Sequence, residues 1–208
     1  LIAGHFWKNP QAYGEEGTAK ASYDEILKVM DLMGVKGQYP VYMGAARGLE
    51  NEETPIDCEG VRFLIDEAMR EDERPLYIAC QGSLTDVASA LLIKPEIAER
   101  MTVIWIGGGD YPVGGFEFNL MMDVHAVNVV FSSKVPVWQV PKSLYKVMAV
   151  SLAELQLKVK PCGEIGKYLF EQMTEFNHYA AKYEMEWPHG EIWGLGDQGT
   201  IAVLKIGR

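Results

Sequence analysis

Short apolar stretches alternate along the chain with longer stretches that have helical spacing. Uninterrupted apolar runs of roughly four to eight residues are typical of strands buried on both faces, and apolar residues repeated every three or four positions are typical of amphipathic helices. The predicted strands are Leu1–Phe6, Tyr39–Ala45, Pro75–Gly82, Thr102–Gly109 and Val135–Pro141. The predicted helical stretches are Ala21–Gly34, Asp57–Glu71, Ser83–Met101 (with a second short helix from Pro95), Asp123–Ser133, Ser151–Val159, Glu164–Met185 and Asp197–Ile206.

This alternation predicts parallel βαβ units, because parallel neighbouring strands need a crossover connection that is usually a helix. We therefore expect an α/β fold with a doubly wound, mostly parallel central sheet flanked by helices. Residues 1–208 read as one domain, and since both ends fall within apolar elements, we expect that domain to be truncated at both ends. Ligands of such sheets bind outside the carboxyl ends of the strands, so the loops there are the first place to look for chemistry.

The overall composition is that of an ordinary soluble protein with an acidic surplus. Hydrophobic residues make up 48% of the chain, charged residues make up 23%, and the formal net charge is −10. This charge argues against nucleic acid or an anionic membrane as the main partner, and no apolar run is long enough to span a bilayer. The cysteines, Cys58, Cys80 and Cys162, have neither CxxC nor zinc spacing, which predicts a reducing, cytoplasmic setting.

One short stretch places polar groups among aromatic ones. Glu117 and Asn119 alternate with Phe116 and Phe118, shortly after the glycines at 107–109. This period of two predicts a strand end on which Glu117 and Asn119 share one face while the phenylalanines point into the core. The common sequence motifs of phosphate loops, zinc proteases and serine hydrolases do not occur in the chain, and a glutamate at a strand end is by itself most often a solvated edge residue.

Several segments, in the same order, resemble the inosine–uridine-preferring nucleoside hydrolase family. LYIACQGSLTDVASALLIKPEIAERMTVIWIGGG (76–109) is similar to the family's strand, G-x-L-T-N turn, helix, PEIA element and second strand. FEFNLMMDVHAV (116–127) is similar to its E-F-N-x-x-x-D-P-x-A-A segment. YPVYMGAARGL (39–49) and GDQGTIAVL (196–204) also look like family segments, and the combination of the Leu-Thr turn with the Glu-Phe-Asn triplet makes the resemblance specific.

The resemblance implies an enzyme that hydrolyses the N-glycosidic bond of ribonucleosides. The family passes through an oxocarbenium-like transition state and uses a water activated by Ca²⁺, a hard cation that binds oxygen ligands. Carried over to this chain, Asp197 would be a carboxylate ligand of calcium and Thr85 would contribute its main-chain carbonyl. Glu117 and Asn119 would hydrogen-bond the ribose hydroxyls.

The largest departure concerns the family's N-terminal D-x-D-x-x-x-D-D cluster. In the family this cluster lies upstream of the segment that matches residues 1–6, and it supplies most of the calcium carboxylates and the general base. The chain does not contain it. We therefore expect the general base outside these residues, in a longer enzyme, unless the protein lacks this chemistry. The upstream coding sequence would discriminate between the two.

The residues that would face the sugar and the base also differ from the family. His5, with Asn9 as an alternative, stands near a sugar-contacting asparagine of the family, and Gly196 replaces the histidine associated with protonating the leaving base. Aromatic and histidine side chains before residue 197 are a second source of leaving-group activation, although packing accounts for them equally well. They are Tyr179, Tyr183, His178, His189 and Trp193.

Three functions are compatible with these observations. The first is a calcium-dependent nucleoside hydrolase of purine or pyrimidine salvage, the second a hydrolase of a different ribosyl or glycosyl compound, and the third a non-catalytic nucleoside- or sugar-binding relative. As binding partners, the resemblance implies a small-molecule nucleoside and a second copy of the chain in a homodimer or homotetramer. No nucleic acid and no membrane are expected as partners.

Overall fold

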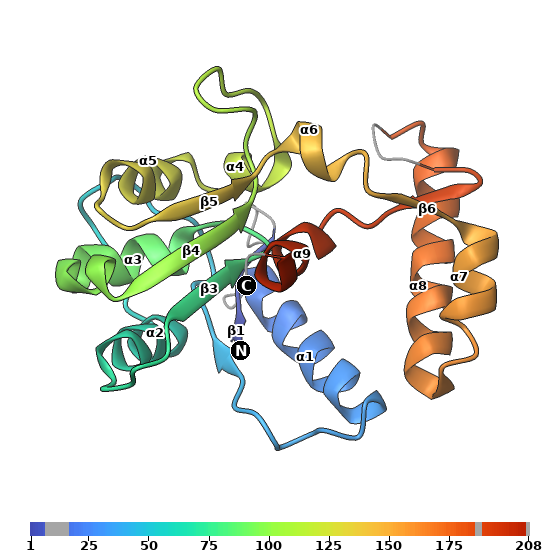
Figure 1. The fold of residues 1–208 in the computed structure, drawn as a ribbon, viewed down its shortest axis with the longest axis horizontal. Helices are drawn as coiled ribbons and strands as arrows, with labels where there is room; N and C mark the ends of the chain where they lie inside the picture. The colour runs from blue at the N-terminus through green and yellow to red at the C-terminus, as the bar shows by residue number, and fades with distance from the viewer. Residues whose placement is uncertain (7–16, 186–188, 207–208) are drawn as a thin grey trace.

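The computed structural model describes residues 1–6, 17–185 and 189–206, in which strands and helices alternate (Figure 1). The strands are β1 (Ile2–Ala3), β2 (Tyr42–Met43), β3 (Leu76–Cys80), β4 (Met101–Ile106), β5 (Val137–Val140), β6 (Ala149–Ser151) and β7 (Ile192–Gly194). The helices are α1 (Gly17–Leu32), α2 (Glu59–Met69), α3 (Thr85–Ile93), the 3-10 helix η2 (Pro95–Glu99), α4 (Phe118–Met122), α5 (Val124–Ser132), α6 (Lys142–Tyr145), α7 (Leu152–Lys158), α8 (Gly163–Lys182) and α9 (Gln198–Ile206).

The main sheet is parallel, as the alternation predicts. β4 lies between β3 and β5, and Val103 pairs with Ile78 on one side and Val137 on the other. β1 and β2 form a second parallel pair, and β6 and β7 form an antiparallel one. The α/β class is therefore confirmed, with the parallel strands in two hydrogen-bonded groups within the described part of the chain.

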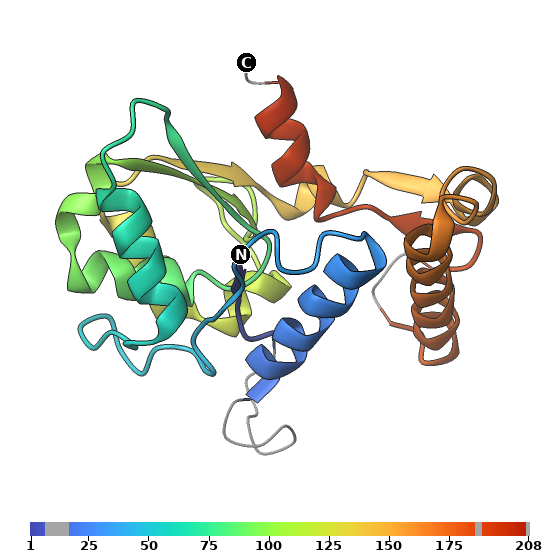
Figure 2. The same ribbon diagram turned by 90° about the horizontal axis from the view of Figure 1, so that it is seen from below.

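Helices cover both faces of the β3–β4–β5 sheet. The apolar stripes of α2, α3 and α5 pack on one face, where Val61, Val87 and Val130 join Val103 and Trp105 in a buried core. α9 lies on the other face (Figure 2). This layering leaves the carboxyl ends of the strands to the loops, which is where the candidate site is found.

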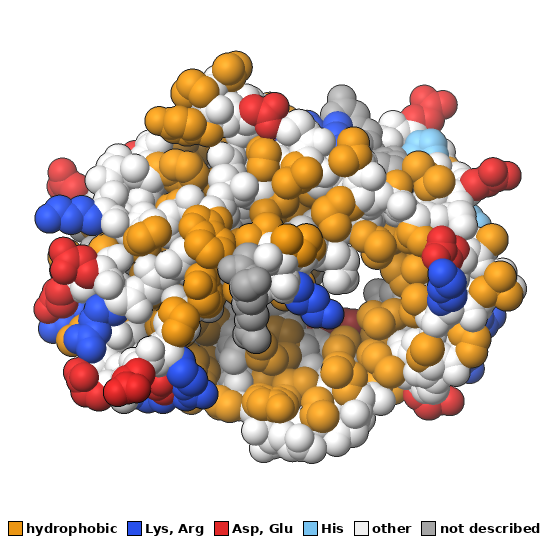
Figure 3. All heavy atoms as spheres, in the orientation of Figure 1, with side chains coloured by type: hydrophobic (Ala, Val, Ile, Leu, Met, Phe, Trp, Pro, Cys, Tyr) orange, Lys and Arg blue, Asp and Glu red, His pale blue; other side chains and the backbone are white. Residues whose placement is uncertain are grey.

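A smaller layer of α7, α8, β6 and β7 lies beside the main sheet (Figure 1). It contacts α1 through the hydroxyl of Tyr168, which donates to the carboxylate of Glu25 across 2.7 Å, and the Lys28 ammonium lies 3.9 Å from the Tyr168 ring centroid. The surface is hollowed between this layer and the rest of the molecule, with hydrophobic side chains around the hollow (Figure 3). Among the helices that the structure describes, none is long and apolar enough to cross a membrane.

Candidate functional site

Glu117 is a buried carboxylate at the carboxyl end of β4. It is only 2% exposed. Its Oε2 accepts hydrogen bonds from the backbone N–H groups of Gly108 and Leu120, each at 2.9 Å, and its Oε1 accepts one from the hydroxyl of Tyr145, also at 2.9 Å. These donors compensate for the loss of solvation on burial, so the carboxylate has a fixed position.

The predicted strand end at this point is wrong. Glu117 caps the N-terminus of α4, and Asn119 lies inside that helix. Phe116 and Phe118 are 68% and 46% exposed, so neither anchors the segment in the core. A carboxylate that bonds the N–H three residues ahead favours a helical turn over a strand, and an alternation only four residues long does not exclude this.

The glycine loop after β4 is held by side-chain amides. Asn119 Nδ2 donates to the carbonyl of Ile106 across 2.8 Å, and Gln139 Nε2 donates to the carbonyls of Gly107 and Gly109, each across 2.8 Å. Gly108 has a φ of +69°, a conformation that favours glycine. Asn119 and Glu117 thus fix the backbone of the same loop, one through a carbonyl and the other through an N–H.

A buried chain of hydrogen bonds links β1 to α3 and α5. The Thr85 hydroxyl donates to Asp123 Oδ2 across 2.7 Å, and His5 Nε2 lies 2.9 Å from the same hydroxyl and 3.1 Å from Ser83 Oγ. Because a carboxylate can only accept, the Thr85 proton goes to Asp123 and the hydroxyl oxygen accepts from His5 Nε2–H. The structure therefore brings together His5 and Thr85, two of the predicted site residues.

This arrangement keeps His5 neutral. The ring is 2% exposed, and its burial lowers the pKa, an effect that the charge of Asp123 opposes. His5 Nδ1 is buried and has no hydrogen-bond partner within the described ranges. Asp123 also accepts from the backbone N–H of Leu49 at 2.8 Å and of Ala126 at 2.9 Å, so it connects three segments of the chain.

Asp197 follows β7 and leads into α9. The residue as a whole is exposed, yet the protein packed around its carboxylate raises its pKa, and the negative charge of Glu117 raises it further. Gln81 Nε2 donates to the Asp197 carbonyl across 3.3 Å and to Thr200 Oγ1 across 3.1 Å. The loop after β3 thus contacts Asp197 through Gln81 and His5 through Ser83.

Tyr145 is a member of this site that the sequence did not single out. Besides its bond to Glu117, its ring packs against Gly196, where an added Cβ would lie 3.3 Å from Tyr145 Cδ2. Burial, the charge and hydrogen bond of Glu117 and the charge of Asp197 all raise the pKa of the phenol, so it stays protonated at neutral pH. The glycine at 196 was noted as a departure from the family; the tyrosine that fills this space lies 51 positions earlier in the sequence.

The acidic residue of the Leu-Thr-Asp turn, Asp86, bonds a different segment from Asp123. Asp86 Oδ1 accepts from the backbone N–H of Ala45 at 2.7 Å and lies 3.7 Å from the Cys58 thiol. Burial raises the pKa of Asp86 despite these hydrogen bonds, and it raises the pKa of Cys58 to about 11. The raised pKa keeps the Cys58 thiol protonated at neutral pH, which makes it a poor nucleophile.

The other predicted contacts lie apart from this site. Tyr179 and Tyr183 are exposed on α8 with ring centroids 4.6 Å apart, and His189 is exposed. In the described part of the chain, no hydrogen bond or ring contact joins these three residues to Glu117 or Asp197. Asn9 lies outside the described residues.

The described residues do not form a calcium site by themselves. Asp197 and the Thr85 carbonyl are the predicted ligands, and calcium takes six to eight oxygens. Nowhere in the described ranges do three or more acidic, histidine or cysteine side chains gather in an arrangement that could hold a metal ion. The donor set of the described residues therefore falls short of what calcium requires.

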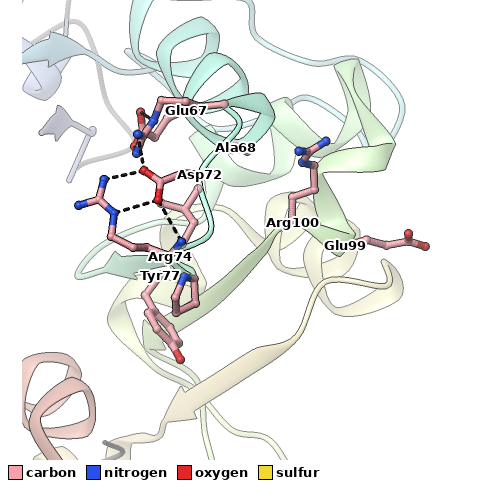
Figure 4. A pocket seen from close by; sticks show the side chains of 10 residues that line it. Glu67, Ala68, Asp72, Arg74, Tyr77, Glu99 and Arg100 are labelled. Carbon is pink, nitrogen blue, oxygen red and sulfur yellow. Dashed lines mark hydrogen bonds and ion pairs between the residues drawn. The ribbon is translucent and has the colours of Figure 1, made fainter.

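A pocket of about 760 Å³ lies away from these residues, near the start of β3 and the end of α2 (Figure 4). Its arginines are already engaged: Arg70 pairs with Glu67 and Asp72, and Arg74 pairs with Asp72. All of these groups reach solvent, so the pairs contribute little stability. Because the charges of Arg70, Asp72 and Arg74 are already paired with one another or with Glu67, this pocket offers less chemistry than the strand ends do.

Comparison with known proteins identifies the family. The family model "Inosine-uridine preferring nucleoside hydrolase" matches residues 13–206, and the chain belongs to this family. An inosine-uridine preferring nucleoside hydrolase of Leishmania major is 28% identical over 148 residues, which are 69% of this chain and 46% of the relative. The pyrimidine-specific ribonucleoside hydrolase RihB of Escherichia coli is 28% identical over 149 residues, which are 67% of this chain and 45% of that protein. The chain thus spans about half the length of these curated relatives.

Solved structures confirm the fold. A purine-preferring ribonucleoside hydrolase from Gardnerella vaginalis superposes with a TM-score of 0.74 at 22% identity, covering 89% of this chain and 67% of that one. A plant nucleoside hydrolase superposes with a TM-score of 0.70 at 18% identity, and the superposition covers 88% of this chain and 65% of the plant enzyme. At these identities the likeness concerns the fold, which is that of the nucleoside hydrolases.

Proposed function

We propose that the protein hydrolyses the N-glycosidic bond of ribonucleosides to ribose and free base. The observation that carries this proposal is the buried Glu117 carboxylate, fixed by Gly108, Leu120 and Tyr145 and electrostatically coupled to Asp197. Such a group can orient the hydroxyls of a sugar without reorganising during the reaction. Membership of the nucleoside hydrolase family supports this reading.

The proposed reaction breaks the bond between C1′ and the base nitrogen and forms a bond between C1′ and a water oxygen. One proton of the water is lost to a base, and the departing nitrogen gains a proton. Glu117 and Asn119 would orient the ribose, with Asp197 beside them. No described residue is assigned as the general base, which we continue to predict in an N-terminal acidic cluster.

The proposal names ribose as the sugar of the nucleoside and does not name which base the enzyme prefers. The relatives' names include inosine-uridine, pyrimidine-specific and purine-preferring enzymes, so what they share is a nucleoside and not one base. In this chain Gly196 provides no proton donor for the leaving base. Tyr179, Tyr183 and His189 as base contacts, calcium at Asp197 and Thr85, a cytoplasmic location, a salvage role and a homodimer or homotetramer stay predictions.

The direct test incubates the purified full-length protein, including the segment predicted to hold the general base, with inosine, guanosine, adenosine, uridine and cytidine, and quantifies free base and ribose by chromatography. We expect base and ribose in equal amounts, and we expect Glu117→Ala to abolish their release without unfolding the protein. Glu99→Ala, on the opposite edge of the sheet, is the matched control. Activity unchanged by Glu117→Ala would contradict the assignment of this carboxylate.

A second function, nucleoside binding without turnover, is favoured by one observation: the described residues include the proposed ribose contacts Glu117 and Asn119 and no assigned general base. Equilibrium binding to the same panel separates the two. Binding with base release supports the hydrolase, binding without release supports the non-catalytic relative, and the absence of both overturns the proposal.

A further inference from the structure

Tyr145 is the accessible end of the hydrogen-bonded group around Glu117. Glu117 is 2% exposed and its Oε2 already accepts two backbone N–H groups, whereas Tyr145 is only partly buried. The phenol stands at the end of α6, directly after β5, and so at the carboxyl edge of the sheet. Tyr145 is therefore the more exposed member of the pair that it forms with Glu117 at this edge.

The ring of Tyr145 is held against the segment that carries Asp197. An added Cβ on Gly196 would lie 3.3 Å from Tyr145 Cδ2 and 3.8 Å from Ile106 Cδ1, which leaves little room for a side chain at 196. The negative charge of Asp197 reaches the phenol as well as that of Glu117. Tyr145 thus lies within the electrostatic reach of two carboxylates that come from distant parts of the chain.

The hydrogen-bonding capacity of the phenol then defines what it can recognise. Its one proton is donated to Glu117 Oε1, so its oxygen is left as an acceptor. The carboxylate of Asp197 is an acceptor too. The Tyr145 ring packs against Gly196, the residue before Asp197, so the two acceptors come from adjoining parts of the site. They match a ligand that presents several O–H donors, as a ribose does.

We propose that the phenol oxygen of Tyr145 accepts a hydrogen bond from a ribose hydroxyl of the bound nucleoside, and that it thereby selects ribonucleosides over their deoxy analogues. This inference rests on the proposed function, since it names the group that reads the sugar in that same site. Gly196 contributes to this selectivity, because the absence of a side chain at 196 leaves space for the Tyr145 ring to hold its position.

The test compares the wild-type protein with Tyr145→Phe, which removes the hydroxyl and keeps the ring. Inosine, uridine and their 2′-deoxy and 3′-deoxy counterparts are the probes, and affinity is measured as Kd, or as KM where turnover occurs. We expect Tyr145→Phe to weaken ribonucleoside binding by about tenfold, the size of one hydrogen bond. For the deoxy analogue that lacks the contacted hydroxyl, the affinity should not change.

Two further variants separate this role from a structural one. Ser143→Ala removes a hydroxyl that lies on the same helix as Tyr145 and donates to Asp110. This variant should keep the preference for ribose. Gly196→Ala should reduce the preference by displacing the ring, and should have no further effect in the Tyr145→Phe background. Thermal unfolding of each variant reports whether it folds.

The outcomes distinguish this inference from the function on which it rests. A wild-type preference for ribose that persists in Tyr145→Phe overturns the inference and leaves the proposed function standing. A wild-type protein that neither binds nor cleaves any nucleoside overturns the proposed function and the inference with it. A preference that is lost in Tyr145→Phe and kept in Ser143→Ala supports both.

Discussion

The hydroxyl of Thr85 and the carboxylate of Asp123 are joined by a buried hydrogen bond of 2.7 Å. This bond ties the first turn of α3 to the N-terminus of α5, and Asp123 also holds the backbone of Leu49 and Ala126. We therefore expect Asp123→Ala to lower the free energy of unfolding by about 3 kcal/mol, because it leaves buried donors unpaired. Thr85→Val should cost about 1–2 kcal/mol, since one donor is lost.

Urea denaturation checks both values, with Asp66→Ala on the exposed side of α2 as the control for removing an aspartate. That control should change stability by less than about 0.5 kcal/mol. If Asp123→Ala proved as stable as the control, the assignment of Asp123 as the junction of three segments would be wrong.

Asp86 should make the fold less stable at neutral pH than a neutral side chain would. Burial raises its pKa above the ordinary 3.8, so the group favours folding most below pH 3.8, and this contribution is lost as the pH rises through the raised pKa. Asp86→Asn retains an oxygen for the Ala45 N–H and carries no charge. We expect it to raise the melting temperature at pH 7 by about 2–4 °C, which corresponds to about 1 kcal/mol.

Calorimetry at several pH values provides the check for Asp86→Asn. The advantage of the variant should shrink toward pH 3.8 and disappear below it, where the wild-type carboxyl is protonated. An advantage that stays constant across this range would show that charge burial is not its origin. Asp66→Asn, at an exposed position, should show no pH-dependent difference.

The contact between Tyr145 and Glu117 predicts an altered phenol titration. Burial and the nearby carboxylates raise the pKa of Tyr145 above the ordinary 10.0, and stability from this group is therefore lost as the pH rises past 10. Glu117→Gln removes one charge, so the pKa should fall part of the way back, because burial remains. Ultraviolet difference titration against Tyr145→Phe isolates this phenol, and an identical titration in wild type and Glu117→Gln would contradict the contact.

Calcium should have little effect on this chain alone. The described residues bring no set of metal-binding side chains together. Asp197 and the Thr85 carbonyl supply too few oxygens, since calcium takes at least six oxygen ligands. We expect millimolar calcium or its removal by chelator to shift the melting temperature by less than about 1 °C. Micromolar binding that disappears in Asp197→Asn would contradict this expectation and would show that further ligands are supplied.

The elements of the fold could be predicted because their signals are local. Val61, Leu64 and Ile65 repeat at helical spacing, and β4 is apolar except for Thr102, so both element types follow from period and length. The segment at 116–119 could not be resolved in the same way. Its alternation is short, and the capping bond from Glu117 to Leu120 decided in favour of a helix.

The candidate site could be predicted only where a motif carried it. Motifs predicted Glu117, Thr85 and His5 as site residues, and the structure joins two of them directly, while their roles stay predictions. Tyr145 was not found, since its partner lies 28 positions away and no spacing rule connects a helix-terminal tyrosine to a distant carboxylate. Contacts of this kind come from the packing of loops, which the period of a sequence does not encode.

The loop after β3 has a further consequence for how the protein assembles. Ser83 contacts His5 and Gln81 contacts Asp197, so a few consecutive residues are bonded to positions near both ends of the described chain. Long loops must close before either contact forms, and contacts so distant in sequence are costly to make early. The main sheet joins strands that are closer in sequence, so we expect it to assemble before these contacts form and the loops of the candidate site to take their positions afterwards.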